Sequence, residues 1–494
     1  MQGLLQNKKL MIIIGVAVLI IIGIILAIVF GSKPAAKVVV GNPNVELVWW
    51  KPKFSSSVYN ETINGFKALP GNQNVTVRQI DVPFDEDYYR NLITDFARGR
   101  GPDIFSFKND DFASLKEFMT PVSGVAGVTE SKLLADYKTN FVDSVVQSGT
   151  DLDKVYAISS YVDNLQLYYN KNLLQQAGIA QPPTTWADLE KQLVQLNKRG
   201  LDQKFTQSAI SLGTGYLTDK ADTSQGYNIA NFNDILATLV VQNGGQLYDY
   251  TTSQPTFGQN RNQKDLATGN ITDKSFSVKF DQDNPTYKAV KFYMDFAQPN
   301  NTRYSWNTES KLSTDAFIEG KLAYTIGYST FEDDITKRNS RLQYGVSELP
   351  QLDLNNKKTY GTFMMDGISR QLEIDSAKNP KDADKLAKLA KAREFMNYLT
   401  TLEAQKKFFS KTNLPAARKD IIDLQTSGDE KLRIFAAGNL YAFTYYKPDP
   451  NRVDRMWGNL IYNVQFQNLT LDDSLTKAVQ EYALAVQKGP RIRM

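Results

Sequence analysis

The chain has 494 residues, of which 42% are hydrophobic and 22% are charged, enough for two or more globular units with cores of their own. It contains no cysteine and no histidine, which excludes disulfides, thiolate or imidazole metal ligands and histidine-based acid–base catalysis. The formal net charge of +4 comes from four lysines that precede residue 38, so the rest of the chain is neutral and lacks the basic character of nucleic-acid-binding proteins.

The first thirty residues predict a membrane anchor. Residues 10–30 are an uninterrupted apolar run, which at about 1.5 Å per residue spans a hydrocarbon core of roughly 30 Å. The run is longer than the apolar region of a cleaved signal peptide, about 7–15 residues, although a cleaved signal remains the alternative. Because Lys8 and Lys9 precede it, we expect a single-pass helix with a cytoplasmic tip at 1–9, a linker at 31–44 and the body outside the cell.

Residues 45–107 alternate between strand and helix patterns. Strands are predicted at 45–50, 75–80 and 103–107. A helix between the last two is indicated by Asp85 as its N-cap and Gly99 as its stop. The βαβαβ order predicts an α/β fold with a parallel, doubly wound sheet.

A second unit with the same alternation follows. Residues 154–169 are rich in strand-forming side chains, and Thr185 to Asp188 form a capping box for a helix that we expect to end at Gly200. The polar stretch 251–275 predicts an exposed excursion. Further expected elements are helices at 228–242 and 285–297, a strand at 322–326 and a long helix that begins at Asn379 and Pro380.

Aromatic and acidic side chains follow two of the predicted strands. Trp50 ends the first strand and Phe107 the third, and ligands of open α/β sheets bind beyond the carboxyl ends of strands. Aromatic faces suit the apolar face of a sugar ring, while Asp110 or Asp111 can accept charge-assisted hydrogen bonds from hydroxyl groups. The alternative is that both aromatic side chains are core residues and that one of the acidic residues caps the next helix.

Catalytic and metal-binding patterns are weak. A glycosidase needs two carboxylates about 5–9.5 Å apart, but with 53 acidic residues no motif singles out a pair. The sequence has no phosphate-binding Gly-rich loop followed by Lys-Ser/Thr and no Gly-x-Ser-x-Gly, and residues 281–284 depart from the calcium-binding loop pattern. We therefore expect no catalytic residue, no metal site and no cofactor.

Four segments, in order and at matching spacing, resemble the family-one bacterial extracellular solute-binding proteins, the group that contains the maltose-binding protein. The similarity extends over roughly residues 45–490. The segments are Gly101-Pro102-Asp103-Ile104-Phe105, then Val155-Tyr156-Ala157-Ile158 through Leu167-Tyr168-Tyr169-Asn170-Lys171-Asn172-Leu173 to Thr185-Trp186, then Phe317 to Tyr324, and Lys411 to Ala416.

This resemblance implies a two-lobed periplasmic-binding-protein-like fold. Each lobe would be a mainly parallel sheet flanked by helices, with the ligand in the cleft and closure about a hinge. The N-terminal lobe would hold 45–158 and 350–403, and the C-terminal lobe 162–345 and 408–490. The chain would then cross between the lobes near 158–162, 345–350 and 403–408.

The resemblance also implies ligand-binding residues from both lobes. Phe107, Tyr328 or Phe331, and Trp457 stand at aromatic positions, and Asp110 and Asp163 at carboxylate positions. The full expected set is Trp50, Phe107, Asp110, Tyr161, Asp163, Asn231, Tyr328, Phe331, Asp366 and Trp457. For each of these residues, core packing remains the alternative.

The function implied is that of the extracellular substrate-binding component of an ABC importer, capturing a small polar solute such as a mono- or oligosaccharide. The expected partners are this ligand, the permease subunits and the membrane, and the protein is expected to be a monomer. Family members typically carry a lipid-modified cysteine, which this chain lacks, so the N-terminal helix is inferred to replace it. An extracellular glycan hydrolase and a surface sensor or adhesion protein remain the alternatives.

Overall fold

The computed structural model describes residues 44–52, 57–84, 86–124, 128–215, 227–249, 254–256 and 283–489. The described residues from Asn44 onward belong to one compact unit. The expected tip, anchor and linker lie outside the described residues, except for Asn44, as does the expected helix cap Asp85. Within the described ranges, no helix is both long enough and apolar enough to cross a bilayer.

The first sheet begins as the sequence predicts. Strand β1 (Val45–Pro52) pairs in parallel with β2 (Val75–Val82) and with β3 (Ile104–Lys108). Helices α2 (Asn60–Ala68) and α3 (Glu86–Ala97) connect these strands, which confirms the βαβαβ order. Gly99 lies just beyond α3 with φ +65°, a conformation that glycine adopts without strain, and this confirms it as the helix stop.

The remaining strands of this sheet make it mixed rather than mainly parallel. The strand order is β2-β1-β3-β17-β4, and β7 also pairs with β17. Strand β17 (Met364–Ser369) runs antiparallel to β3, β4 (Met119–Thr120) and β7 (Ala157–Ile158). The expected mainly parallel sheet is therefore wrong for this lobe, because a strand from late in the chain enters between β3 and β4 in the opposite direction.

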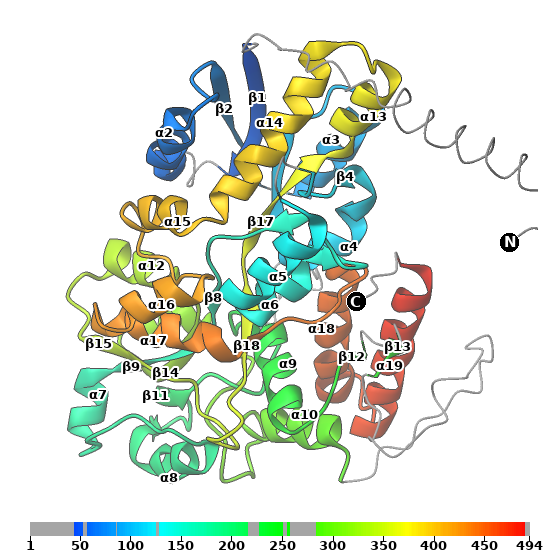
Figure 1. Ribbon diagram of the computed structural model, residues 1–494. Helices are drawn as coiled ribbons and strands as arrows, with labels where there is room; N and C mark the ends of the chain where they lie inside the picture. The colour runs from blue at the N-terminus through cyan, green and yellow to red at the C-terminus, as the bar shows by residue number, and fades with distance from the viewer. Residues whose placement is uncertain are drawn as a thin grey trace, which may run out of the picture. The chain divides into compact units, whose positions relative to one another are not determined.

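Aromatic packing fixes helices onto the first sheet. The indole of Trp49 on β1 lies 4.9 Å from the ring of Tyr59 and 5.4 Å from Phe395 on α14 (Ala383–Leu399). Figure 1 shows α14 lying alongside β1 and β17. This helix begins three residues later than expected, because Asp382 accepts the N–H groups of Asp384 and Lys385 as its N-cap. Helix α13 (Arg370–Lys378) and the short segments η2 (Ser57–Tyr59), η3 (Asn109–Asp111), α4 (Phe112–Leu115) and η4 (Lys116–Phe118) complete this part of the chain.

The second sheet is also mixed. Its strand order is β10-β11-β14-β9-β15. Only β11 (Phe205–Ile210) and β14 (Leu322–Gly327) pair in parallel, while β9 (Gln166–Asn170) runs antiparallel to β14 and to β15 (Tyr344–Ser347), and β10 (Lys198–Arg199) runs antiparallel to β11. The expectation of a mainly parallel sheet is thus wrong here too, since β9 returns between two strands of opposite direction.

Helix α8 (Trp186–Leu196) shows how local sequence sets an element boundary. The hydroxyl of Thr185 accepts the N–H of Asp188 at 3.1 Å, which confirms Thr185 as the N-cap of the predicted capping box. The same hydroxyl donates to the Asp188 carboxylate at 2.8 Å. The helix ends before Gly200, because Asn197 already has extended backbone angles. The other helices around the second sheet are α7 (Lys171–Gln176), α9 (Phe232–Gln242), α10 (Pro285–Asp295), α11 (Ser313–Ile318) and α12 (Phe331–Arg338).

A small third sheet contains two strands from segments that run from one large sheet to the other, together with β18 from the C-terminal part of the chain. Strand β16 (Thr359–Thr362) pairs with β18 (Ala442–Phe443) and with β8 (Asp163–Asn164). Strand β8 follows β7 of the first sheet and precedes β9 of the second, and β16 links β15 to β17. The strands of the two large sheets fall within the ranges expected for the two lobes, except that β15 extends to Ser347, past the expected boundary at 345. The exact boundaries of the lobes stay a prediction.

The remaining elements are two short strand pairs, two helices that follow β4 and the helices of the C-terminal part of the chain. Strands β12 (Tyr248–Asp249) and β13 (Gln254–Pro255) pair at the start of the expected polar excursion, most of which lies outside the described residues. The other elements are α5 (Glu130–Asn140), α6 (Asp143–Gly149), β5 (Thr150–Asp151), β6 (Lys154–Val155), α15 (Leu402–Phe409), α16 (Lys419–Gln425), α17 (Glu430–Gly438), η6 (Asn439–Tyr441), α18 (Pro450–Phe466) and α19 (Leu471–Lys488).

Candidate functional site

An ion-pair cluster around Lys447 brings together side chains from both halves of the fold. The ammonium nitrogen of Lys447 lies 2.8 Å from a carboxylate oxygen of Asp110, 3.2 Å from one of Asp454 and 3.8 Å from one of Asp234. Asp110 follows β3 of the first sheet, whereas Asp234 lies in the first turn of α9, beside the second sheet, and Asp454 lies on α18. The cluster therefore joins side chains that the expected domain boundaries assign to different lobes.

Tyrosine side chains complete the cluster. The Tyr360 hydroxyl donates to Asp110 at 2.9 Å, and the Tyr328 hydroxyl donates to Asp234 at 2.6 Å. The Lys447 ammonium also lies 5.2 Å from the ring centroid of Tyr360 and 5.3 Å from that of Tyr445, within the range of cation–π attraction. Two ring faces and three carboxylates thus surround a single cation.

Burial and the neighbouring charges shift the pKa values of this cluster in opposite directions. The Lys447 side chain is 2% exposed, whereas that of Asp454 is 43% exposed and forms the solvent-facing edge. Burial would lower the pKa of Lys447, but Asp110 and Asp454 outweigh it and hold that pKa well above its usual value. Burial raises the pKa of Asp234 to about 6, against the opposing attraction of Lys447. Among the described residues, no group of three or more acidic side chains is arranged so that it could hold a metal ion.

Three of the residues expected from the sequence belong to the cluster or adjoin it. Asp110 and Tyr328 are members of it, and the Trp457 indole N–H donates to the hydroxyl of Tyr445 at 3.0 Å. Trp457 is fully buried, so it presents no free ring face in this conformation. Asn231 precedes α9 with φ 59°, three residues before Asp234. A direct ligand contact by any of these side chains remains a prediction.

Asp163, a second expected carboxylate, is saturated by backbone groups. It is 3% exposed and accepts the N–H groups of Ser329 at 2.7 Å, Thr330 at 3.3 Å and Asn164 at 3.0 Å. Because Ser329 and Thr330 immediately precede α12, the carboxylate satisfies donors at the start of that helix. Its observed role is to tie β8 to α12, and contact with a ligand stays a prediction.

The ionisation of Asp163 gives a pH-dependent stability that can be measured. Burial raises the pKa of Asp163 to about 6, and the backbone donors of Ser329, Thr330 and Asn164 only partly offset this. Between the unfolded-state pKa of about 4 and the folded-state value, the folded protein binds more protons, so its free energy of unfolding falls as the pH rises. Across this pH window, we expect the free energy of unfolding of wild type to fall by roughly 1–3 kcal/mol relative to that of Asp163→Asn, because asparagine does not titrate. Urea unfolding at a series of pH values measures this difference, and parallel pH curves for the two proteins would contradict it.

The other expected residues divide between the hinge segments and the cores. Tyr161 forms a bridge with Ala416, and its hydroxyl bonds the backbone of Met364. Phe331 is 8% exposed and packs against Tyr168 with ring centroids 5.2 Å apart. These contacts hold Tyr161 against residues 364 and 416 and Phe331 in the core beside the second sheet, while the expected crossing near 158–162 stays a prediction.

The expected residues of the first sheet lie away from the Lys447 cluster or beneath the surface. Phe107 is fully buried, with its ring 6.5 Å from that of Phe112. Asp366 is 6% exposed and accepts hydrogen bonds from the Trp49 indole at 2.9 Å and the Ser106 hydroxyl at 2.5 Å. Trp50 is partly exposed and lines a hollow of about 410 Å³ between β2 and α3. Phe107 and Asp366 are both buried, as expected if they are core residues. Their contact with a ligand stays a prediction.

Sequence reasoning missed the centre of the cluster. Lys447, Asp234 and Asp454 belong to no motif, and Tyr360 and Tyr445 come from segments far apart in the chain. The available signal was the run of aromatic side chains at 441–446, directly before Lys447, which marked the segment without identifying the lysine.

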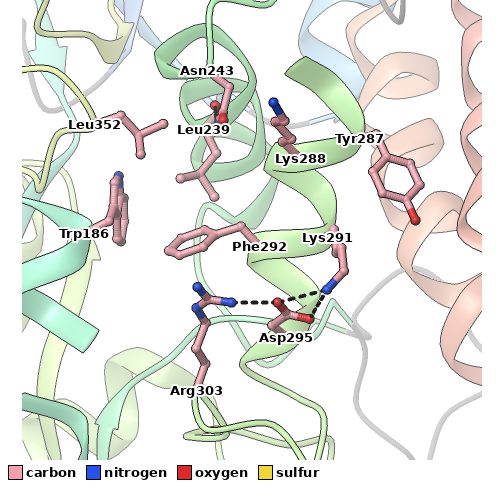
Figure 2. Close-up of a pocket in the computed structure, with 10 residues that line it drawn as sticks. All are labelled: Trp186, Leu239, Asn243, Tyr287, Lys288, Lys291, Phe292, Asp295, Arg303 and Leu352. Carbon is pink, nitrogen blue, oxygen red and sulfur yellow. Dashed lines mark hydrogen bonds and ion pairs between the residues drawn. The ribbon is translucent and has the colours of Figure 1, made fainter. Parts of the chain in front are cut away.

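A separate hollow of about 370 Å³ lies on the second lobe between α8, α9 and α10. Figure 2 shows Trp186, Phe292 and Leu239 around it, while Tyr287 points away. Its basic side chains are engaged: Arg303 pairs with Asp295 at 2.9 Å, and Lys291 pairs with the same carboxylate. None of the expected site residues lines this hollow, so the Lys447 cluster remains the candidate site.

Comparison with known proteins places the chain among solute-binding proteins. The sequence profile described as bacterial extracellular solute-binding protein matches residues 62–432. A galactooligosaccharide-binding protein of Bacillus subtilis is 24% identical over 196 residues, which cover 39% of this chain and 44% of that relative. The match thus spans less than half the length of this curated relative.

Solved structures share the fold at low sequence identity. The maltose-binding periplasmic protein of Listeria monocytogenes, in complex with maltose, is 18% identical with a TM-score of 0.62, covering 90% of this chain and 98% of its own. The cyclic α-maltosyl-1,6-maltose binding protein of Arthrobacter globiformis is 15% identical with a TM-score of 0.66, covering 90% and 100%. At these identities the likeness establishes a two-lobed α/β binding-protein fold.

Proposed function

The chain belongs to the bacterial extracellular solute-binding proteins, and on that premise we propose that it captures a small polar solute, a mono- or oligosaccharide, between its two lobes. The observation that carries the proposal is the Lys447 cluster, which holds carboxylates from both lobes beside tyrosine rings. We propose further that the bound solute is handed to the permease subunits of an ABC importer.

The chemistry of the cluster suits a hydroxyl-rich ligand. A carboxylate accepts hydrogen bonds from two hydroxyl groups at once, and a lysine ammonium donates to several. Tyrosine rings offer apolar faces and hydroxyl edges, which match the two surfaces of a sugar. The names of the relatives, with galactooligosaccharide and maltose as ligands, support the same ligand class.

We propose a cell-surface location, which the family and the predicted anchor support. Family members are extracellular binding proteins rather than enzymes. The apolar run at 10–30 would hold this chain in the membrane with residues 1–9 inside and the body outside. The body would act as a monomer next to the permease.

Calorimetric titration of the full chain, purified in detergent, tests the ligand class. We expect saturable one-site binding of at least one sugar from a panel of maltose, maltotriose, galactobiose and galactotriose, without release of shorter products. Asp110→Asn should weaken that binding at least tenfold, about 1.4 kcal/mol, because it removes the cluster carboxylate that the first sheet contributes. Binding of no sugar on this panel by a folded protein would contradict the proposal.

Asp136→Asn is the matched control for this substitution. Asp136 is a 56% exposed carboxylate of α5, paired with Lys132 on the same helix. It lies outside the cluster, so its replacement should leave affinity unchanged within twofold. Equal losses in the two variants would show that Asp110 has no special part in binding.

A further inference from the structure

The surroundings of Lys447 have the composition of a cation-binding cage. Carboxylate oxygens of Asp110, Asp454 and Asp234 lie within 4 Å of its ammonium, and the rings of Tyr360 and Tyr445 flank it. Such combinations of ring faces and carboxylates are used by proteins to bind ammonium groups of ligands. Here the group that fills the cage is the protein's own side chain.

The cage is built around the ammonium rather than around a neutral group. The second carboxylate oxygens of Asp110 and Asp234 accept the hydroxyls of Tyr360 and Tyr328. Their other oxygens are the ones that lie closest to Lys447. Because Lys447 is almost fully buried, its charge is compensated by these groups and not by water.

We propose that Lys447 is the specificity-determining residue of the site, whose ammonium fills the cage so that neutral hydroxyl-rich sugars are accepted and cationic amino sugars are refused. The inference rests on the proposed function, because it assigns a charge preference to the same site. An amino sugar meets the fixed ammonium at the point where its own charge would otherwise be stabilised. Specificity then arises from a repulsive element as well as from attractive contacts.

Removing the ammonium should reverse the preference. Without Lys447, three carboxylates and two ring faces remain with no cation among them, and a charged amino group of a ligand supplies the missing charge. A neutral sugar should gain no comparable affinity, since its hydroxyls cannot neutralise the carboxylates. A residue that only held the lobes together would weaken both ligand types alike when replaced.

The first experiment tests the cage without any sugar. Lys447→Ala removes the part of the side chain that corresponds to propylammonium. We expect added propylammonium chloride to raise the thermal midpoint of Lys447→Ala by several degrees more than equal concentrations of sodium chloride or 1-propanol. Lys191→Ala, at a 74% exposed lysine on α8 paired with Asp188, is the control and should show no such selective gain. Equal effects of the three additives on Lys447→Ala would overturn the cage assignment.

The second experiment measures the preference by calorimetry with maltotriose and with the trimer of glucosamine. We expect wild type to favour the neutral trimer and Lys447→Gln, which is one atom shorter than lysine and carries no charge, to bind the glucosamine trimer at least tenfold more tightly than wild type does. Lys447→Arg should keep the wild-type preference. An unchanged preference in Lys447→Gln would overturn the proposal. If wild type binds no sugar at all, the proposed function fails, while the propylammonium result still decides whether the cage is a cation site.

Discussion

Replacing Trp457 with alanine is expected to lower the free energy of unfolding by about 3–5 kcal/mol. Trp457 is fully buried in α18, and its indole N–H donates to the hydroxyl of Tyr445. Alanine leaves a large cavity, and it removes the donor that the Tyr445 hydroxyl accepts from. Urea unfolding followed by circular dichroism measures the loss.

Tyr462→Ala is the matched control, because Tyr462 lies on the same helix and is 37% exposed. Its loss should be roughly 1 kcal/mol or less. A loss at Trp457 no greater than this would show that α18 does not pack as described.

This expectation changes what the sequence alone suggested for Trp457. The resemblance places Trp457 at an aromatic ligand-binding position, where its ring would contact the ligand. Since the ring is buried and supports Tyr445 beside Lys447, a binding defect in Trp457→Ala cannot be separated from a packing defect. Trp457→Phe, which keeps most of the buried volume, is the variant in which to measure affinity.

The second large effect is expected at Asp366, the buried carboxylate of β17. Asp366→Ala should destabilise the protein by about 3–5 kcal/mol, because it breaks up a buried charged network. The carboxylate accepts hydrogen bonds from Trp49 and Ser106, and it is the leading attractive charge acting on the buried Lys51. Burial already lowers the pKa of Lys51 to about 8, and loss of Asp366 would lower it further. Chemical denaturation at neutral pH measures the effect.

Asp81→Ala is the control for Asp366→Ala, because it removes an exposed carboxylate near Lys51 instead of a buried one. Asp81 also attracts Lys51 but is exposed at the sheet edge on β2, so its removal should cost about 1 kcal/mol or less. Equal losses for Asp81→Ala and Asp366→Ala would contradict the account of Asp366 as the buried counter-charge.

Local sequence was sufficient for the elements but not for the direction of the strands. The Thr185 N-cap and the βαβαβ order of residues 45–108 are confirmed, because both depend on neighbouring residues. The mixed character of the first sheet depends on β17, which pairs with β3 across more than 250 residues. Because no short-range sequence pattern indicates such a pairing, the prediction of a mainly parallel sheet is wrong.

The same distinction explains what was found and missed in the site. Asp110 was identified because it follows a recognisable strand motif, whereas Asp234 and Lys447 become neighbours of it only through the fold. Asp163 stands at a recognisable position, but no sequence pattern indicates that the backbone N–H groups of Ser329 and Thr330 bind its carboxylate. Residues of a site are therefore easier to predict singly than as a hydrogen-bonded set.

Hydrogen–deuterium exchange of the full chain, with and without the tightest-binding sugar of the panel, tests most directly that a solute is held at the Lys447 cluster by both lobes. We predict ligand-induced protection in three separate peptides, at 104–115 of the first lobe and at 228–242 and 441–460 beside the second. Protection confined to one lobe, or centred on the outer hollow at 285–303, would contradict the account.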